Sequence, residues 1–369
     1  MKPALTAARV LNTRADAVAK EKEAQRADLP AQLWLYPKLR FMGSKFRLLP
    51  WLHSVLSELD FGSALDAFSG SGCVAYLLKA MGKTVHTNDF LCFPTTIAQA
   101  TVENSTVTVT DQALGRLLAK PRTPMHFIEK TFKGIFYKQA DLQFLDRIWS
   151  NLPTIRDRKA RSIVVSALIR SCAKRQPRGV FTVAGDPERY KDGRRDVMLS
   201  IEEHFLEQLA IFNRAVFSNG KENTAGSGSI FDFPERKVDL VYMDPPYVPR
   251  ADDNCYMKRY HFLEGLACYW EGKEILEETR VKKIAKPFTP FSYKRTAIEA
   301  FDGLFQKFSK SKIVLSYSSN GFPDLDVLVD LMKKRKKRVD VHEKDHRYHF
   351  GTHDKVERAQ VQEYLIVGQ

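Results

Sequence analysis

Residues 63–89 read SALDAFSGSGCVAYLLKAMGKTVHTND, and this stretch decides the fold. Residues 63–68 form a short apolar run that predicts a buried strand, and the glycines after it predict a tight loop. Apolar residues then recur at helical spacing over 73–81, and residues 84–89 alternate like a second strand. The order strand, loop, helix, strand predicts a parallel βαβ unit of the dinucleotide-binding kind.

Three later apolar runs predict the rest of the sheet. They read VDLVYM, KIVLSY and EYLIV, at residues 238–243, 312–317 and 363–367. Their length and content of β-branched residues are typical of buried strands. The stretch between the βαβ unit and these runs has mainly helical periodicity, so we expect an α/β protein with a helical insertion.

The length of 369 residues predicts one large domain with a second, smaller lobe. We expect residues 1–35 to form an arm or helix outside the core. Residues 106–224 should form an inserted, mainly helical domain. Residues 36–105 and 225–369 then make up the α/β domain.

Composition points to a folded protein without a membrane segment. Hydrophobic residues make up 44% of the chain, which is enough for a real core. No apolar run reaches the roughly 20 residues of a membrane span, and the N-terminus mixes charges where a signal peptide would be apolar. The five cysteines are widely spaced without a CxxC pair, which favours small buried residues over disulfides or structural zinc. We expect the protein to stay in the cytoplasm.

The formal net charge is +14, and the commonest partner of so basic a protein is a phosphate backbone. Charge alone suits RNA, DNA or a ribosome equally. Between residues 170 and 195 the chain carries a dense run of Arg and Lys around Gly, Pro and Phe. We interpret this run as part of a nucleic-acid surface, with solvated surface charge as the alternative.

The strongest motif is the DPPY tetrapeptide, which follows the predicted strand 238–243 and consists of Asp244, Pro245, Pro246 and Tyr247. The N6 amine of adenine is a poor nucleophile, so an enzyme that alkylates it must accept hydrogen bonds from both amino hydrogens. The Asp244 carboxylate and the Pro245 carbonyl are such acceptors. The prolines make the backbone rigid, and Tyr247 offers a face for a flipped base. The alternative is a strand-ending turn.

A second motif is the glycine loop of residues 66–72, in which we single out Asp66, Phe68, Gly70 and Gly72. Its glycines let the backbone approach a cofactor closely, and the turn offers N–H groups to it. Asp89 follows about twenty residues later, the spacing at which an acid binds a ribose diol. An ordinary glycine turn and a capping aspartate are the alternatives.

These two motifs, in this order, resemble those of the D12 class of adenine-specific DNA methyltransferases, the group that includes the Dam methylases. The resemblance covers residues 36–105 and 225–320. It implies a Rossmann-like, S-adenosylmethionine-dependent methyltransferase sheet with an inserted target-recognition lobe. It also implies N6-methyladenine in double-stranded DNA as the product, in a restriction-modification or related DNA-modification system. Whether a restriction or defence partner acts with the protein stays open.

The resemblance also implies residue roles outside the two motifs. Residues 40–45 read RFMGSK where the class has Lys-Trp-Ala-Gly-Gly-Lys, which implies that Phe41 packs on the cofactor beside Gly43 and that Lys45 meets its methionine carboxylate. The chain departs from that pattern with Phe for Trp, Met for Ala and Ser for the second Gly. Phe231 and Asp232 resemble the Asp-Phe pair that holds the cofactor adenine, with a strand-edge cluster as the alternative.

Basic and aromatic side chains give the candidate DNA contacts. In the inserted lobe we expect phosphate contacts from Arg175, Arg178, Arg194 and Arg195. After the catalytic motif, Lys258, Arg259 and Tyr260 suit a loop beside a flipped base, although core packing also explains an aromatic there.

Two clusters do not change the interpretation. The run Lys333 to Arg338 reads as a solvated or DNA-facing patch. His342, His346, His349 and His353 lack a cysteine partner, and methyl transfer from a sulfonium needs no metal, so we expect none. Four alternatives stay open: an RNA adenine, a protein glutamine, a cytosine N4, or a cofactor-binding DNA-recognition subunit of a larger complex.

Overall fold

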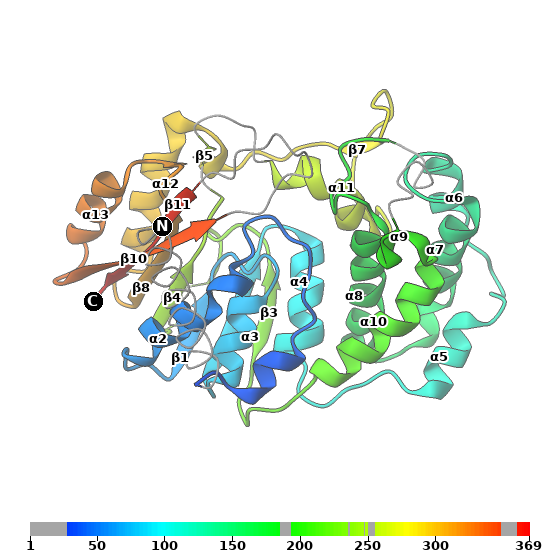
Figure 1. The fold of residues 1–369 in the computed structure, drawn as a ribbon, viewed down its shortest axis with the longest axis horizontal. Helices are drawn as coiled ribbons and strands as arrows, with labels where there is room; N and C mark the ends of the chain where they lie inside the picture. Colours follow the sequence, from blue (N-terminus) through cyan, green and yellow to red (C-terminus); the bar gives the residue numbers. More distant parts are fainter. Residues whose placement is uncertain (1–27, 185–192, 235–236, 247, 250–254, 348–359) are drawn as a thin grey trace, which may run out of the picture.

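The computed structural model describes residues 28–184, 193–234, 237–246, 248–249, 255–347 and 360–369. Figure 1 shows two parts side by side: a sheet flanked by helices, and a lobe made almost wholly of helices. The predicted combination of an α/β domain with a helical lobe is confirmed.

The sheet has seven strands among the described residues, in the order β10-β11-β8-β4-β1-β2-β3. The strands from β8 to β3 run parallel, and β11 lies antiparallel to both β8 and β10. Their bounds are β1 (Ser63–Asp66), β2 (Thr84–Asp89), β3 (Thr224–Ser227), β4 (Leu240–Met243), β8 (Lys312–Ser318), β10 (Val339–Arg347) and β11 (Gln360–Gly368).

Strand β4 lies near the centre of the sheet and is buried on both sides. Leu240 and Tyr242 face one hydrophobic cluster, while Val241 and Met243 face another. A parallel sheet covered by helices on both faces produces such a continuous apolar strand. The helices α2 (Leu49–Ser57) and α3 (Cys73–Ala80) contribute to the first cluster, and α12 (Lys294–Lys307) and α13 (Leu325–Lys333) to the second.

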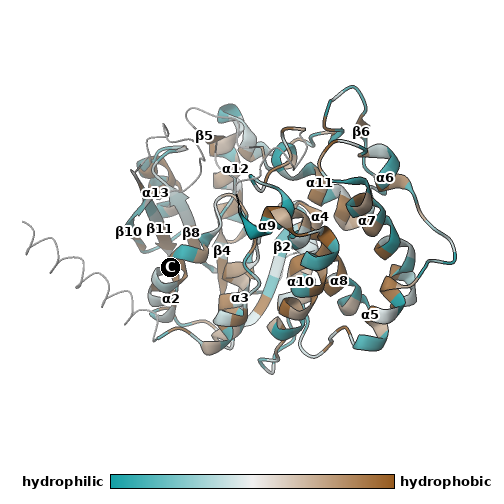
Figure 2. Cartoon of the chain, turned by 45° about the vertical axis from the view of Figure 1, so that its right-hand side comes forward, coloured by the Kyte–Doolittle hydropathy of each residue, from teal (hydrophilic) through white to brown (hydrophobic). Residues whose placement is uncertain are grey.

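The helical lobe is built around α8, which packs against α4, α10 and α11. Most side chains of α8 are buried, so its sequence lacks a polar stripe. In Figure 2 the apolar residues gather where the helices of this lobe face one another. The helices are α4 (Cys92–Ala98), α5 (Asp111–Leu118), α6 (Phe127–Thr131), α7 (Gln139–Asn151), α8 (Arg158–Arg175), α9 (Arg195–Met198), α10 (Ile201–Ala215) and α11 (Tyr256–Cys268).

The core of this lobe extends beyond the predicted insertion. Helices α4 and α11 lie outside residues 106–224 in sequence but share one hydrophobic cluster with α7, α8 and α10. The helix α4 runs directly into a π-helix, Gln99–Glu103. The lobe is therefore attached to the sheet through helices that begin next to β2 and after β4.

The expectation for residues 1–35 needs a correction at its end. Leu29 and Leu33 are buried in the cluster that contains α2 and α3, because the short helix η1 (Ala31–Leu35) packs there. Residues 1–27 lie outside the described part of the chain. The shorter remaining elements are η2 (Lys45–Leu48), η4 (Leu152–Thr154), β5 (Val248–Pro249), β6 (Ile275–Leu276), β7 (Lys283–Ile284), η6 (Pro290–Ser292) and β9 (Gly321–Phe322).

The packing around α8 gives a direct stability prediction. Leu168 is fully buried on α8, so we expect Leu168→Ala to lower the free energy of unfolding by about 2–5 kcal/mol. The matched control is Leu206→Ala on α10, whose side chain is exposed and should change stability little. Urea unfolding measures both. Equal midpoints for the two variants would contradict the placement of α8 at the centre of the lobe.

Candidate active site

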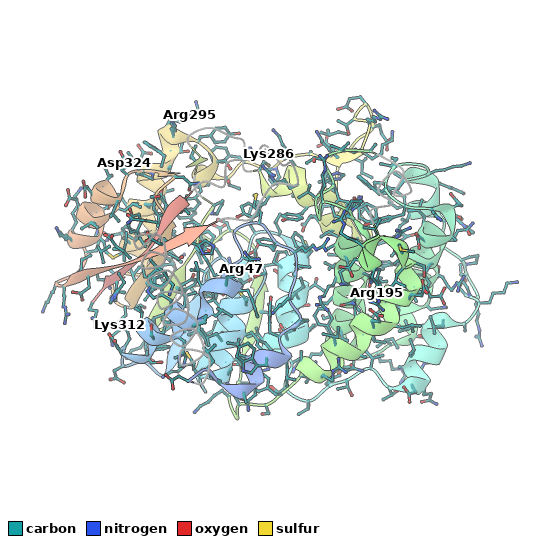
Figure 3. The ribbon with its side chains drawn as sticks, in the orientation of Figure 1. Arg47, Arg195, Lys286, Arg295, Lys312 and Asp324 are labelled. Atoms are coloured by element: carbon teal, nitrogen blue, oxygen red, sulfur yellow. The ribbon has the colours of Figure 1, made fainter. Side chains whose placement is uncertain are left out.

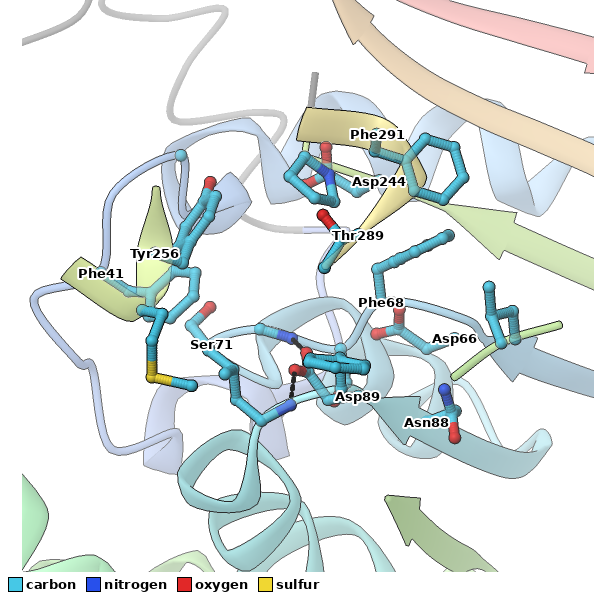
Figure 4. A pocket seen from close by; sticks show the side chains of 18 of the residues that line it. Phe41, Asp66, Phe68, Ser71, Asn88, Asp89, Asp244, Tyr256, Thr289 and Phe291 are labelled. Carbon is cyan, nitrogen blue, oxygen red and sulfur yellow. Dashed lines mark hydrogen bonds between the residues drawn. The ribbon is translucent and has the colours of Figure 1, made fainter. Parts of the chain in front are cut away.

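One cavity of about 320 Å³ lies at the carboxyl ends of β1, β2 and β4. This is the edge at which open α/β sheets bind their ligands. Figure 4 shows side chains from several separate segments converging on it, among them Asp66, Asp89 and Asp244. Residues 41–45 and 286–292 line the remaining sides.

Asp244 follows β4 directly and has an ion pair at the cavity wall. The Lys45 ammonium, on η2, lies 3.2 Å from Asp244 Oδ1. Burial raises the pKa of Asp244 to about 6, and the positive charge of Lys45 keeps it from rising further. At neutral pH the carboxylate is therefore mainly ionised and able to accept hydrogen bonds.

The predicted contact of Lys45 with the methionine carboxylate of a cofactor stays a prediction, and two carboxylates of the chain lie beside the Lys45 ammonium. The Lys45 side chain is only 3% exposed, and its ammonium also lies 3.4 Å from Oε2 of Glu363 on β11. Two carboxylates of the chain itself thus hold this charge. Sequence reasoning missed Glu363, because a single acid in the apolar run EYLIV carries no motif.

The rest of the DPPY motif is only partly described. Pro245 is buried and Pro246 lines the cavity. Tyr247, the predicted stacking residue, lies outside the described residues.

Asp66 is a buried carboxylate at the end of β1 that faces the cavity. Neither of its oxygens has a well-formed hydrogen bond within the described residues, although the amides of Phe68 and Ala75 are near enough to lower its pKa slightly. Burial first, and then repulsion from Asp244 and Asp89, raise the pKa of Asp66 to about 8. Such a group is suited to a cationic ligand.

Asp89 is held by the backbone at the end of β2. Its Oδ2 accepts the Gly70 N–H at 2.8 Å and its Oδ1 accepts the Leu91 N–H at 2.9 Å (Figure 4). Burial raises its pKa to about 6 and these two bonds oppose the rise. Each oxygen keeps a second lone pair, so the ribose contact stays a prediction.

The glycine loop requires its glycines for conformation and space. Gly70 and Gly72 have φ angles of +49° and +79°, which side chains rarely adopt. A Cβ on Gly70 would lie 3.1 Å from the Phe41 ring. The loop therefore packs closely against the segment that carries Phe41.

The ring of Phe41 packs against two tyrosines of α11, whose own ring centroids lie 6.3 Å apart. It lies parallel to Tyr260, with ring centroids 5.2 Å apart, and 5.3 Å from Tyr256. The Tyr260 hydroxyl accepts the Met42 N–H at 2.8 Å, and the Tyr256 hydroxyl donates to the Met42 carbonyl at 3.2 Å. The two tyrosines are four residues apart on a helix, a spacing that could have indicated their common face.

This stack determines the outcome for two predicted residues. Tyr260 is buried, so the prediction that it lies beside DNA is wrong; its ring supports Phe41 and its hydroxyl holds Met42. Gly43 lines the cavity, with φ +73°, and a Cβ there would meet the Tyr256 hydroxyl at 3.1 Å.

A second aromatic group forms the opposite wall. Phe291 stacks on Phe231, with centroids 6.0 Å apart, and meets Phe68 edge-on at 5.5 Å. Asp232, the other half of the predicted pair, is exposed and is not among the residues that line the cavity. The segment of residues 286–292 was not predicted, because it contains no motif that sequence reasoning singled out.

Helix α11 makes a second connection to the sheet, next to the end of β2. Glu264 is buried and accepts the N–H groups of Cys92 and Phe93, at 3.0 and 3.2 Å, which begin α4. Lys273 neutralises it at 2.7 Å. A carboxylate at a helix N-terminus is favourable, so this contact fixes where α4 begins relative to Asp89.

Comparison with known proteins decides the family. The model of the D12 class N6 adenine-specific DNA methyltransferases matches residues 41–318. The chain belongs to this family. Type II methyltransferase M2.HphI of Haemophilus parahaemolyticus is 27% identical over 327 residues, which cover 85% of this chain and 92% of that protein.

Two longer relatives resemble the chain over part of their length. Modification methylase StsI of Streptococcus sanguinis is 24% identical over 80% of this chain and 46% of its own length. Type II methyltransferase M.FokI of Planomicrobium okeanokoites is 23% identical over 77% of this chain and 45% of its own length. The chain spans about half of each.

The methyltransferase family implies a methyl donor and a DNA substrate for the cavity. The predicted DNA contacts differ in how they suit this role. Arg175 is buried, with Nε 3.8 Å from Asp141 Oδ2, so the prediction of a phosphate contact there is wrong. Arg194 is half-buried and donates to the Pro177 carbonyl at 2.9 Å. Arg178 and Lys258 are exposed, and Arg259 is partly exposed.

Arg195 is exposed but forms an ion pair with Glu207 on α10. In Figure 3 it lies on the helical lobe, well away from Lys286, which lines the cavity between the two parts. The side chains at the cavity mouth are therefore different from the ones that the basic run suggested.

The remaining predicted features are local. Lys336 donates to the Ser309 carbonyl and Arg335 pairs with Asp302, so part of the basic run serves the fold.

No group of three metal-ligating side chains occurs among the described residues, which include His342 and His346 but not His349 or His353. In the same part of the chain no helix is long and apolar enough to cross a membrane. The five cysteines form no disulfide among the described residues. Three of them are buried as predicted: Cys73, Cys172 and Cys255.

The raised pKa of Asp66 gives a pH prediction for the protein without ligands. The Asp66 carboxyl is protonated in the folded state at a pH where it is ionised in the unfolded state. The free energy of unfolding of the protein therefore falls as pH rises from the ordinary pKa near 4 to about 8. Relative to Asp66→Asn, the wild type should therefore lose up to about 1.4 kcal/mol per pH unit in this window.

The measurement is the denaturation midpoint of both proteins from pH 5 to 9. The amount by which the wild-type midpoint falls relative to that of Asp66→Asn should grow up to about pH 8 and then level off. A difference that does not depend on pH would mean that Asp66 is ionised throughout.

Proposed function

We propose that this adenine-specific DNA methyltransferase uses S-adenosylmethionine to methylate the N6 atom of an adenine flipped out of double-stranded DNA. The observation that carries the proposal is the position of Asp244 at the cavity wall, directly after β4, with the Lys45 ammonium 3.2 Å from its Oδ1. The two prolines after it keep competing N–H donors away from the amine.

The cavity suits the proposed cofactor at three positions. Asp66, buried and lacking good hydrogen bonds within the described residues, would receive the methionine ammonium. Asp89 would accept from the ribose diol, and the wall of Phe231 and Phe291 would hold the adenine. S-adenosylmethionine, when bound, supplies an electrophilic methyl group on its sulfonium.

The chain's own groups would act on the amine of the target base. The Asp244 carboxylate and the Pro245 carbonyl accept its two hydrogens, which favours a tetrahedral nitrogen with a localised lone pair. After transfer the nitrogen is positively charged and must lose a proton. Asp244 is the nearest proposed acceptor, and with a pKa of about 6 it would pass the proton on to water at neutral pH.

DNA would reach the cavity along an aromatic and basic edge of residues 286–295. Phe288 is 60% exposed and stacks on the exposed Tyr293, with ring centroids 5.7 Å apart. Lys286 and Arg295 lie over the Tyr293 ring, at 5.2 and 5.9 Å from its centroid. Figure 3 shows Lys286 between the two parts. Exposed rings beside cations suit bases and phosphates.

The opposite side of the DNA path would come from the helical lobe. We assign Arg178, Lys258 and Arg259 to it, which are exposed or partly exposed cations. The relatives are named type II methyltransferases and modification methylases, which supports a role in a restriction-modification system with a cognate endonuclease as partner.

The catalytic proposal is tested by transfer of a labelled methyl group from S-adenosylmethionine to unmethylated DNA, followed by nucleoside analysis. Asp244→Ala should reduce the rate at least about 100-fold while cofactor binding persists. Asp326→Ala, an exposed acid on α13, is the matched control and should behave as wild type. Label in RNA, protein or cytosine would contradict adenine in DNA as the substrate. No transfer at all would favour a cofactor-binding DNA-recognition subunit of a larger complex.

The DNA path is tested by the salt dependence of DNA affinity. Lys286→Ala should weaken binding and reduce the slope of log K against log salt by about 0.9, as expected for one lost phosphate contact. Arg195→Ala removes a charge that is already paired with Glu207, so its slope should stay at the wild-type value. The opposite pattern would place the DNA on the outer face of the helical lobe.

A further inference from the structure

Glu363 is a fully buried acid whose carboxylate meets the ammonium of Lys45 at 3.4 Å. It lies on β11, beyond residues 41–318, which the family model matches. Lys45 lies at the same time 3.2 Å from Asp244. Three segments that are far apart in sequence thus bring two carboxylates to one ammonium.

The position of Glu363 is unusual for its strand. Side chains alternate along a strand, so Glu363 shares a face with Leu365 and Val367. These two pack in the cluster that contains α2 and α3, and a third apolar side chain would extend that cluster. Burial of an unpaired carboxylate destabilises a protein, so a glutamate at this position needs its partner Lys45.

We propose that Glu363 is a positioning residue for methyl transfer, which holds the Lys45 ammonium on Asp244 and thereby sets the orientation and charge of the catalytic carboxylate. The inference rests on the proposed function, because it concerns the carboxylate that receives the adenine amine. Glu363 acts only through Lys45 and by its charge.

Lys45 and Glu363 have opposite effects on the pKa of Asp244. Lys45 lowers the pKa of Asp244, and Glu363, a like charge, raises it, on top of the larger effect of burial. The other titratable groups facing Asp244 are Asp66 on β1, Cys73 on α3 and Tyr242 on β4. Glu363 acts on Lys45 as well, because its carboxylate forms an ion pair with the Lys45 ammonium.

Substitution with glutamine separates the two effects. Glu363→Gln keeps an acceptor for Lys45 and removes the like charge, so the pKa of Asp244 should fall. The acid limb of single-turnover methyl transfer should then move to lower pH, by about one unit, while the plateau rate stays close to wild type. Lys45→Gln removes the cation, and its limb should move to higher pH.

The matched control is Glu343→Gln, the same change at an exposed position on the neighbouring strand β10. In this variant the acid limb of the pH profile of methyl transfer should lie at the same pH as in the wild type. A folded Glu363→Gln variant with an unmoved limb would overturn the proposal, since a purely structural role changes stability without changing this titration. If that variant does not fold, an unmoved limb in Lys45→Gln would overturn it equally.

A readout that needs no turnover separates this inference from the proposed function. Difference infrared spectra of the full chain, taken against Asp244→Asn, report the titration of the Asp244 carboxyl directly. If the wild type transfers no methyl group to DNA, the proposed function fails, and the infrared shift in Glu363→Gln still decides whether Glu363 sets the charge of Asp244.

Discussion

The structure depends on burying three carboxylates around one cavity. Asp66, Asp89 and Asp244 end three neighbouring parallel strands, and burial raises the pKa of each. Their mutual repulsion must be offset within the protein or by a ligand. Lys45 offsets Asp244 and backbone amides offset Asp89, whereas Asp66 has no well-formed hydrogen bond within the described residues. These partners come from the glycine loop, through the Gly70 amide, and from η2, through Lys45.

The helical lobe is joined to this cavity through α11. Its tyrosines hold Phe41 against Gly70, and Glu264 receives the first amides of α4. Both contacts reach the walls of the cavity from a helix whose other side packs in the core of the lobe. The lobe and the cavity are therefore joined through packed side chains of α11.

The sheet could be predicted because its central strands are apolar and its loop needs glycine. Strand β3 was missed because TAGS has no apolar pattern, and β10 because charged residues fill most of VDVHEKDHR. In the site, motif residues such as Asp66 and Asp244 were found from spacing. Glu363, Glu264 and Phe291 were not, since their roles arise from contacts between distant segments. Arg175 and Tyr260 were misassigned because sequence does not show which side of a helix is buried.

The central claim is that methyl transfer needs an ionised Asp244 whose pKa burial has raised. The most direct measurement is the single-turnover rate of methyl transfer to DNA by the wild type, from pH 4.5 to 8. The account predicts a constant rate at the upper end and a tenfold fall per pH unit below about pH 6. A rate that holds down to the ordinary carboxyl pKa near 4 would contradict it.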